Sequence, residues 1–197
     1  MSQKETTMSL LNDGNGYLVT EKAVSSGVNP VTLKRMEETG MIERVAHGLY
    51  IGADVIPDPF FIAQYRCPKG VFSHETALFF NGFSDRTPFQ LMITIPSGWN
   101  TRLISNDDVL IFYSKPIYMD LGINEKITSF GHKVSVYNIE RTLCDCLRSI
   151  DKLDKDLILT ALKRFMKDPV SNKALLLEYA ATFKIRDSVV KYMEVLS

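Results

Sequence analysis

Six side chains in the first fifty residues have the types and the spacing of a surface that binds double-stranded DNA. An arginine such as Arg35 can donate two hydrogen bonds to O6 and N7 of guanine, and Thr32 can contact a thymine methyl group or a phosphate. A lysine such as Lys22 is suited to a phosphate, whatever the base sequence. The candidate DNA-binding residues are Lys22, Thr32, Lys34, Arg35, Arg44 and His47.

Three short helices are needed to position these side chains. Turn-forming residues at 12–16 end the first predicted helix, and Thr20 is the expected N-cap of the second. Residues 26–28 form the predicted turn before the third helix. That helix begins with Asn29 as N-cap and Pro30 at its first position, and Gly40 is placed to end it.

A hairpin of two strands, at 41–45 and 49–51, follows the third helix, with a turn at 46–48. Arg44 and His47 lie on it, where a wing meets the DNA backbone or the minor groove. Leu33 and Met36 are three residues apart, so they share the buried face of the third helix. Residues 1–52 are therefore predicted to form a winged helix-turn-helix.

The same surface would also suit a module that contacts another protein. Residues 1–52 carry five basic and six acidic side chains, and the whole chain has a net charge of zero, unlike a strongly basic nucleic-acid coat protein. Lys34 and Arg35 stand beside Glu37 and Glu38, a pattern that also fits a solvated helix face. DNA binding would depend on the placement of a few charges, and a protein-interaction adaptor is the alternative.

The second part of the chain is predicted to be a separate domain at 58–197, after a connector stiffened by Pro57 and Pro59. Phe79, Phe80 and Phe83, together with Phe89, are expected in its core. Strands are expected at 71–72, 89–95, 109–113, 117–121 and 133–137, and helices at 59–65, 73–80, 139–149, 154–167, 172–183 and 187–196. The predicted fold class is α+β, with a winged helix-turn-helix, a small sheet and a helical C-terminal end.

Several groups resemble catalytic residues but have simpler structural interpretations. His74 beside Ser73 suggests acid–base chemistry, yet Ser73 also suits a helix N-cap. Cys144 and Cys146 form a single pair among apolar neighbours, which is poor evidence for zinc. Arg141 is expected to anchor a buried ion pair with Glu140 or Asp145. We therefore predict no enzymatic activity, no cofactor and no metal.

Composition limits the class of protein further. The 197 residues are 45% hydrophobic, which excludes a mostly disordered chain. No apolar run approaches the ~18 residues of a membrane span. Three cysteines at these spacings do not form a disulfide framework, so a reducing cytoplasm is the expected location. The first fifty residues lack a long heptad pattern, so we expect a monomer in solution and two copies on DNA.

Four segments resemble the abortive-infection AbiE antitoxins, a family of transcriptional regulators. They are residues 20–29 (TEKAVSSGVN), 40–50 (GMIERVAHGLY), 73–78 (SHETAL) and 137–145 (YNIERTLCD). The resemblance implies a repressor that binds inverted repeats in its own promoter. It also implies that the second domain counteracts a partner toxin of the nucleotidyltransferase type, in a system that arrests growth on phage infection.

Overall fold

The structure is a computed structural model that describes residues 2–100 and 108–196. The chain divides into two compact units, Met1–Ile62 and Ala63–Ser197. The sequence predicted domains at 1–52 and 58–197, whereas this division lies inside helix α4 (Pro59–Arg66), a few residues beyond the expected connector. Each unit combines helices with a small sheet, and the fold class is α+β as predicted.

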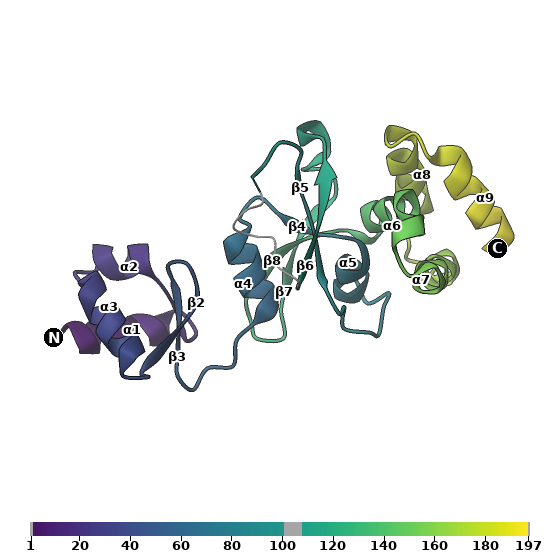
Figure 1. Cartoon of the computed structure of the whole chain (residues 1–197). Helices are drawn as coiled ribbons and strands as arrows, with labels where there is room; N and C mark the ends of the chain where they lie inside the picture. Colours follow the sequence, from purple (N-terminus) through teal and green to yellow (C-terminus); the bar gives the residue numbers. More distant parts are fainter. Residues whose placement is uncertain (1, 101–107, 197) are drawn as a thin grey trace. The chain divides into compact units, whose positions relative to one another are not determined.

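Three short helices lie in the first unit (Figure 1). The first begins with a capping box, in which Ser2 and Glu5 each accept the backbone N–H of the other. The third begins as predicted, with Asn29 as the side-chain cap and Pro30 at the first helical position. Gly27 has a positive φ of 86° in the turn between the second and third helices. The helices are α1 (Gln3–Asp13), α2 (Thr20–Ser25) and α3 (Pro30–Glu38).

A three-stranded antiparallel sheet completes this unit, with the order β1-β3-β2. Its strands are β1 (Tyr17–Val19), β2 (Ile42–Ala46) and β3 (Leu49–Gly52). The β2–β3 hairpin forms the wing of a winged helix-turn-helix, and it turns at Gly48, where φ is 74°. The helices and the sheet bury a common core of Leu11, Leu18, Ala23, Val28, Leu33, Met36, Ile42 and Tyr50.

Thr20 does not cap α2, contrary to the sequence prediction. Strand β1 runs directly into the helix, so Val19 occupies the N-cap position and makes no side-chain cap. The Thr20 hydroxyl instead donates to the carbonyl of Gly48 at 3.2 Å, and the Thr20 N–H donates to the same carbonyl at 2.8 Å. The start of α2 is thereby tied to the turn of the wing.

The second unit contains a mixed five-stranded sheet, with the order β6-β5-β4-β8-β7. Its strands are β4 (Val71–Phe72), β5 (Leu91–Pro96), β6 (Val109–Ser114), β7 (Ile123–Ile127) and β8 (Lys133–Tyr137). The β5–β6 and β4–β8 pairs are parallel, and the β4–β5 and β7–β8 pairs are antiparallel. Helix α5 (His74–Phe80) follows β4, and its Thr76 hydroxyl accepts the N–H of Met92 on β5 at 2.8 Å.

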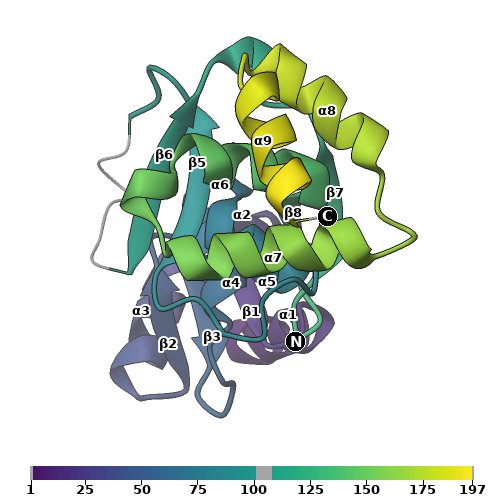
Figure 2. The same cartoon turned by 90° about the vertical axis from the view of Figure 1, so that its right-hand side faces the viewer.

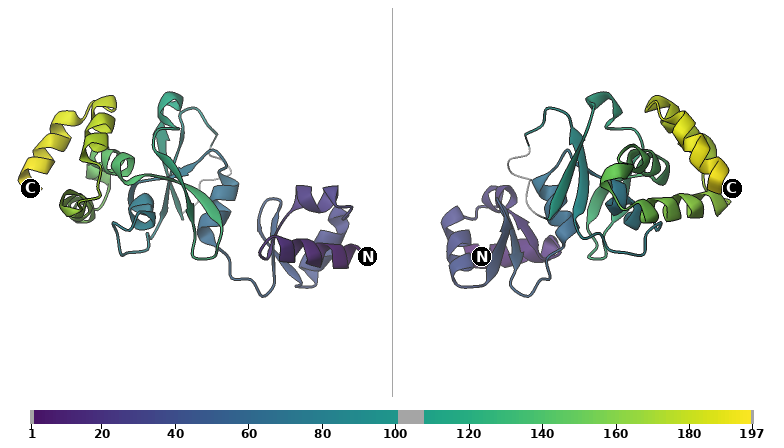
Figure 3. Two further views of the ribbon diagram at one scale, coloured as in Figure 1. Left: turned by 180° about the vertical axis from the view of Figure 1, so that it is seen from behind. Right: turned by 45° about the vertical axis from the view of Figure 1, so that its right-hand side comes forward.

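Helices form the C-terminal end of this unit, as predicted. Figure 2 looks onto them, and Figure 3 shows the same grouping from two further directions. Asn138, Asp154 and Asn172 each cap a helix through a side-chain oxygen, whereas Asp187 lies inside the first turn of the last helix. The helices are α6 (Ile139–Arg148), α7 (Lys155–Lys167), α8 (Lys173–Thr182) and α9 (Arg186–Leu196).

One predicted strand and one predicted core residue of this unit are wrong. Residues 117–121 do not form a strand, because the chain turns there through a short 3₁₀ helix, Pro116–Tyr118; the edge strand is β7 instead. Phe89 is fully exposed and not part of the core. Within residues 2–100 and 108–196, no helix is long and apolar enough to cross a membrane.

Candidate functional site

Helix α3 has one buried face and one face open to solvent. Leu33 and Met36 lie in the core, at 1% and 4% exposure. The open face carries Val31, Lys34 and Arg35 near the start and middle of the helix, and then Glu38, which forms a 3.9 Å ion pair with Lys34. Both ends of that ion pair are well exposed, so it contributes little to stability and is easily exchanged for a phosphate contact.

Thr32 differs from the other candidates because its hydroxyl is already engaged. It donates to Oε1 of Gln3, on α1, and the backbone N–H of Asn29 donates to the same oxygen at 3.1 Å. Gln3 therefore links α1 to the first turn of α3. Val31 takes the exposed position beside it, with 58% of its surface open, and its methyl groups are the apolar contact available to a thymine methyl.

Arg44 and His47 come together on the wing. Nη2 of Arg44 lies 2.9 Å from Nδ1 of His47, and Nε of Arg44 donates to the carbonyl of Ala46 at 3.3 Å. A guanidinium only donates hydrogen bonds, so Nδ1 of His47 is the acceptor in this contact. Both side chains are exposed, which leaves further Arg44 donors at the surface of the wing.

Lys22, also among the six predicted residues, is exposed on α2. All six lie in the first unit, five of them on its surface, and the structure joins Arg44 to His47 directly. Val31 and Gln3 were not among the site residues predicted from the sequence. The i, i+3, i+4 spacing of Val31, Lys34 and Arg35 would have placed Val31 on the open face.

The second unit contains a buried polar cluster around His74. The imidazole is 3% exposed and stacks on the ring of Phe112, with centroids 3.6 Å apart. Its Nδ1 lies 2.9 Å from the hydroxyl of Ser73, which accepts a 2.8 Å hydrogen bond from the hydroxyl of Thr94. Ser73 stands at the N-cap position of α5 but makes no side-chain cap, so that structural prediction for Ser73 is wrong.

The charge state of His74 argues against a role as a general base. Burial, with the guanidinium groups of Arg141 and Arg148 nearby, lowers the pKa of His74 from 6.5 to about 3. A neutral imidazole with so low a pKa is a weak base at neutral pH. His74 also has φ of 49°, a left-handed backbone conformation that is uncommon outside glycine.

Arg141 and Asp145 form the buried ion pair that the sequence predicted for Arg141, with Asp145 as the partner. Nε of Arg141 donates to Oδ2 of Asp145 at 2.7 Å, and Nη1 donates to the carbonyl of Tyr118 at 2.7 Å. Oδ1 of Asp145 accepts from Nη1 of Arg148 at 3.2 Å. Burial raises the pKa of Asp145 and the two guanidinium groups oppose this, so the ionised carboxylate is the form that suits these contacts.

A cavity of about 120 Å³ lies beside this cluster. Its wall includes His74 and Asp145 together with three hydroxyl groups, those of Thr94, Ser114 and Ser149. The rings of Phe112 and Tyr113 and the guanidinium of Arg148 complete the wall. Polar groups therefore dominate a small cavity next to a strained residue.

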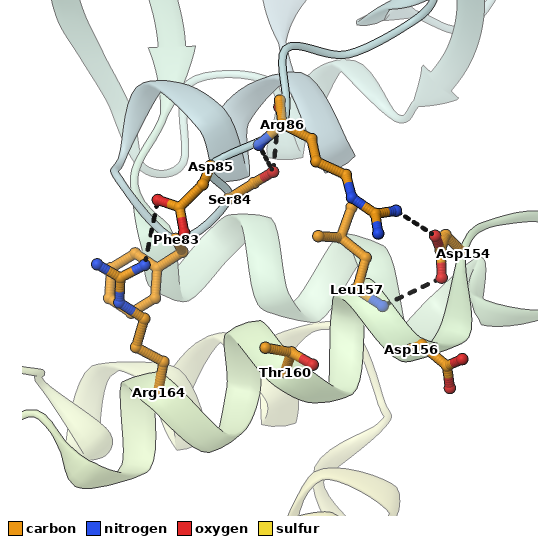
Figure 4. A pocket seen from close by; sticks show the side chains of 9 residues that line it. All are labelled: Phe83, Ser84, Asp85, Arg86, Asp154, Asp156, Leu157, Thr160 and Arg164. Atoms are coloured by element: carbon orange, nitrogen blue, oxygen red, sulfur yellow. Dashed lines mark hydrogen bonds and ion pairs between the residues drawn. The ribbon is translucent and has the colours of Figure 1, made fainter.

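A larger hollow of about 380 Å³ lies between the start of α7 and the loop after α5 (Figure 4). Four of its charged groups form two ion pairs: Arg86 lies 3.6 Å from Asp154, and Arg164 lies 3.8 Å from Asp85. All four side chains are substantially exposed, so these pairs are weak. Asp156 also lines the hollow and leaves one carboxylate in excess, and the buried hydroxyl of Ser84 is bonded to the backbone of Arg86. Neither feature indicates a particular ligand.

The cysteines behave as core residues. Cys67, Cys144 and Cys146 are buried free thiols, and burial raises the pKa of Cys144 to about 12. A thiol with so high a pKa is a poor nucleophile and a poor metal ligand. Among the residues that the structure describes, no group of three or more His, Cys, Asp or Glu side chains is placed to hold a metal ion.

Comparison with known proteins shows a likeness in structure and none in sequence family. No protein-family model and no curated protein matches the chain. The structure is similar to the crystal structure of the RV2827C protein from Mycobacterium tuberculosis, with a TM-score of 0.66 over 97% of this chain and 78% of that chain. The two sequences are 12% identical, so the likeness shows that this chain shares the fold of that protein.

Proposed function

We propose that this protein is a transcriptional autorepressor and antitoxin that binds inverted repeats in its own promoter. The observation that carries the DNA-binding part is the open face of α3, where Val31, Lys34 and Arg35 lie together on the second helix of a helix-turn-helix. In DNA-binding proteins of this architecture that helix enters the major groove. Arg44 on the wing and Lys22 on α2 supply phosphate contacts on either side.

Titration of the protein with its own promoter fragment in gel-shift assays tests this assignment. Arg35→Ala removes a bidentate contact to guanine, at a cost of about 1–3 kcal/mol, or roughly 5- to 150-fold in affinity. It also relaxes specificity at one base pair. The matched control is Lys191→Ala, which removes one exposed charge from α9 of the other unit. Equal affinity and specificity of Arg35→Ala and the wild type would contradict the assignment of α3.

Lys22 is expected to act differently from Arg35. Because a lysine–phosphate contact carries no base information, Lys22→Ala weakens binding to all sequences alike. It also reduces the slope of log affinity against log salt concentration by about 1. Thr32→Val is expected to act through the position of α3, because the Thr32 hydroxyl is engaged by Gln3.

The antitoxin part of the proposal is supported by the resemblance to the AbiE antitoxins across both units. We propose a nucleotidyltransferase-type toxin, encoded by the neighbouring reading frame, as the functional partner, with no enzymatic activity in this chain. Co-expression of the two proteins tests this directly. Rescue of growth supports the proposal, and growth arrest despite soluble expression of this chain contradicts it.

A second candidate is a protein-interaction adaptor that uses the winged helix without DNA. The exposure of Val24 on α2 and Val31 on α3, at 47% and 58%, favours it, because apolar side chains are enriched at interface cores. The two candidates differ in their response to salt. DNA binding through phosphates weakens steeply as salt is raised, whereas an apolar interface does not.

A further inference from the structure

The small cavity beside His74 has an excess of positive charge. Arg148 lines it, the fully buried Arg141 donates to the hydroxyl of Ser114 in its wall at 3.5 Å, and Asp145 is the carboxylate that contacts both arginines. The three groups leave a net charge of +1 in a partly buried setting. Coulomb interactions are stronger there than in bulk water, so the cavity favours an anion.

Arg148 keeps donors available for such an anion. In the described part of the chain, its Nη1 bonds Asp145, and no hydrogen bond holds Nη2 or Nε. Its guanidinium lies over the ring of Phe183, 5.0 Å from the centroid, and this contact limits its movement. A planar guanidinium that is held in place can donate to two oxygens of one oxyanion.

Hydroxyl groups supply the remaining donors. Ser114 and Ser149 line the same cavity as Arg148. Both oxygens of Asp145 are already engaged by guanidinium groups, which reduces their repulsion of an incoming anion. A volume of about 120 Å³ corresponds to about four water molecules, which is enough for one tetrahedral oxyanion but not for a whole nucleotide.

The strain at His74 is a second, independent sign of a built site. A non-glycine residue with φ of 49° costs roughly 1–3 kcal/mol, and such residues persist where the surroundings fix them. Here the ring is fixed by the stack on Phe112 and by the hydroxyl of Ser73. These contacts thus hold a neutral imidazole in the wall of the cavity.

We propose that this cavity binds the phosphate group of a small ligand, with Arg148 as the principal donor and Ser114 and Ser149 as further donors. The ligand is either inorganic phosphate or a small phosphomonoester. Tyr113 lies at the cavity and is 57% exposed, so the rest of an ester would meet its ring outside the cavity. This inference does not depend on DNA binding, because all of its residues lie in the second unit.

Isothermal titration of the full chain tests the site with two probes, inorganic phosphate and a nucleoside 5′-monophosphate, at constant ionic strength. Arg148→Gln is expected to weaken binding of both by about tenfold or more, because it removes the charge and the guanidinium fork. The affinity of Arg148→Lys for both probes is expected to lie between that of Arg148→Gln and that of the wild type. The matched control is Arg164→Gln, which makes the same change in the larger hollow of Figure 4 and is expected to bind as the wild type does.

The two probes distinguish the sources of phosphate. Equal affinity for both indicates inorganic phosphate, and a nucleotide that binds at least tenfold more tightly, with the gain lost in Tyr113→Ala, indicates a phosphomonoester. The Nε–H signal of Arg148 in NMR spectra is expected to shift on addition of phosphate, in the wild type and in an Arg35→Gln variant alike. Absence of binding, equal binding by Arg148→Gln, or equal binding of a nucleoside without phosphate would overturn the proposal.

Discussion

At the scale of single residues, the neutral state of His74 links the stability of the protein to pH. In the folded chain the pKa of His74 is lowered to about 3, whereas its ordinary value is 6.5. Between these values the unfolded chain binds a proton that the folded chain does not bind. Stability therefore rises with pH across this window, and the contribution of His74 is complete above pH 6.5 and is lost as pH falls toward 3.

We expect this loss to approach about 1.4 kcal/mol per pH unit inside the window, in the free energy of unfolding by urea. His74→Asn is the informative variant, because asparagine tolerates a positive φ and does not titrate there. The variant loses the stack on Phe112 and is less stable at pH 7, but its stability depends less on pH between 6.5 and 4. Arg141, Arg148 and Asp145 remain in both proteins, so the difference in slope isolates His74. Equal slopes would contradict the assigned charge state.

The contacts of some residues were predicted from the sequence, and those of others were not. Arg141 was placed in a buried ion pair because an arginine amid apolar helix residues needs an internal partner. Thr32 was placed on the DNA-facing side, but its hydroxyl bonds Gln3, 29 positions away. The positive φ of His74 and its stack on Phe112, 38 positions away, were not predicted, because no local pattern encodes them.

At the scale of elements, the contact between α1 and α3 fixes the helix that is proposed to read DNA. Oε1 of Gln3 accepts hydrogen bonds from the N–H of Asn29 and the hydroxyl of Thr32, at the first turn of α3. Removal of this acceptor leaves both donors to water and frees the start of the helix. Because the contact is exposed, its loss costs little free energy of unfolding. We expect the loss of promoter affinity to be the larger effect.

Gln3→Ala is therefore expected to lower the free energy of unfolding by about 0.5–1.5 kcal/mol and to weaken promoter binding measurably. Lys4→Ala, one position along α1, controls for the loss of an exposed side chain without this contact. Thermal unfolding and gel-shift titration of the two variants check the prediction side by side. Promoter affinity that is the same in Gln3→Ala and Lys4→Ala would show that α1 does not position α3.

Elements with strong local signals were predicted well. Helices α6, α7 and α8 begin next to Asn138, Asp154 and Asn172, whose side chains cap them, and each carries an apolar face. Strand β7 was missed because it is an edge strand of mixed composition, paired with β8 alone and exposed at four of its five residues. Such a strand is stabilised by its pairing with the neighbouring strand, and its sequence shows no alternation of apolar and polar residues.

At the scale of the whole molecule, the expected assembly is a monomer in solution that pairs on an inverted repeat. Helix α1 has 11 residues, and the helices of the first unit lack the length of a coiled-coil seam. Sedimentation at micromolar concentration is expected to give the mass of one chain, and addition of a promoter fragment with both half-sites is expected to give two chains per duplex. A stable dimer without DNA would contradict this expectation.

The boundary between the two units lies inside α4, and the first residues of this helix pack within the first unit. The N–H of Asp58, a fully buried residue, donates to the hydroxyl of Tyr17 at 2.6 Å, and Oδ1 of Asp58 accepts the N–H of Phe60 at the start of α4. Phe61 packs edge-on against the ring of Tyr17, with centroids 4.9 Å apart. The core of the first unit therefore extends to residues 58–61, and a cut after residue 57 removes them.

Fragments of the chain test how function is divided between the units. The fragment 58–197 has 140 residues, enough for an independent core, and we expect it to fold, to rescue growth in part from the partner toxin, and to lose promoter binding.

The fragment 1–57 lacks Asp58 and Phe61, which both contact Tyr17, so we expect it to be less stable than the fragment 1–66. Both N-terminal fragments are expected to bind promoter DNA more weakly than the full chain and to give no rescue. Growth of toxin-expressing cells, with soluble expression of each fragment verified, measures the outcome. Rescue by 1–66, with none by a folded 58–197, would assign antitoxin activity to the winged helix.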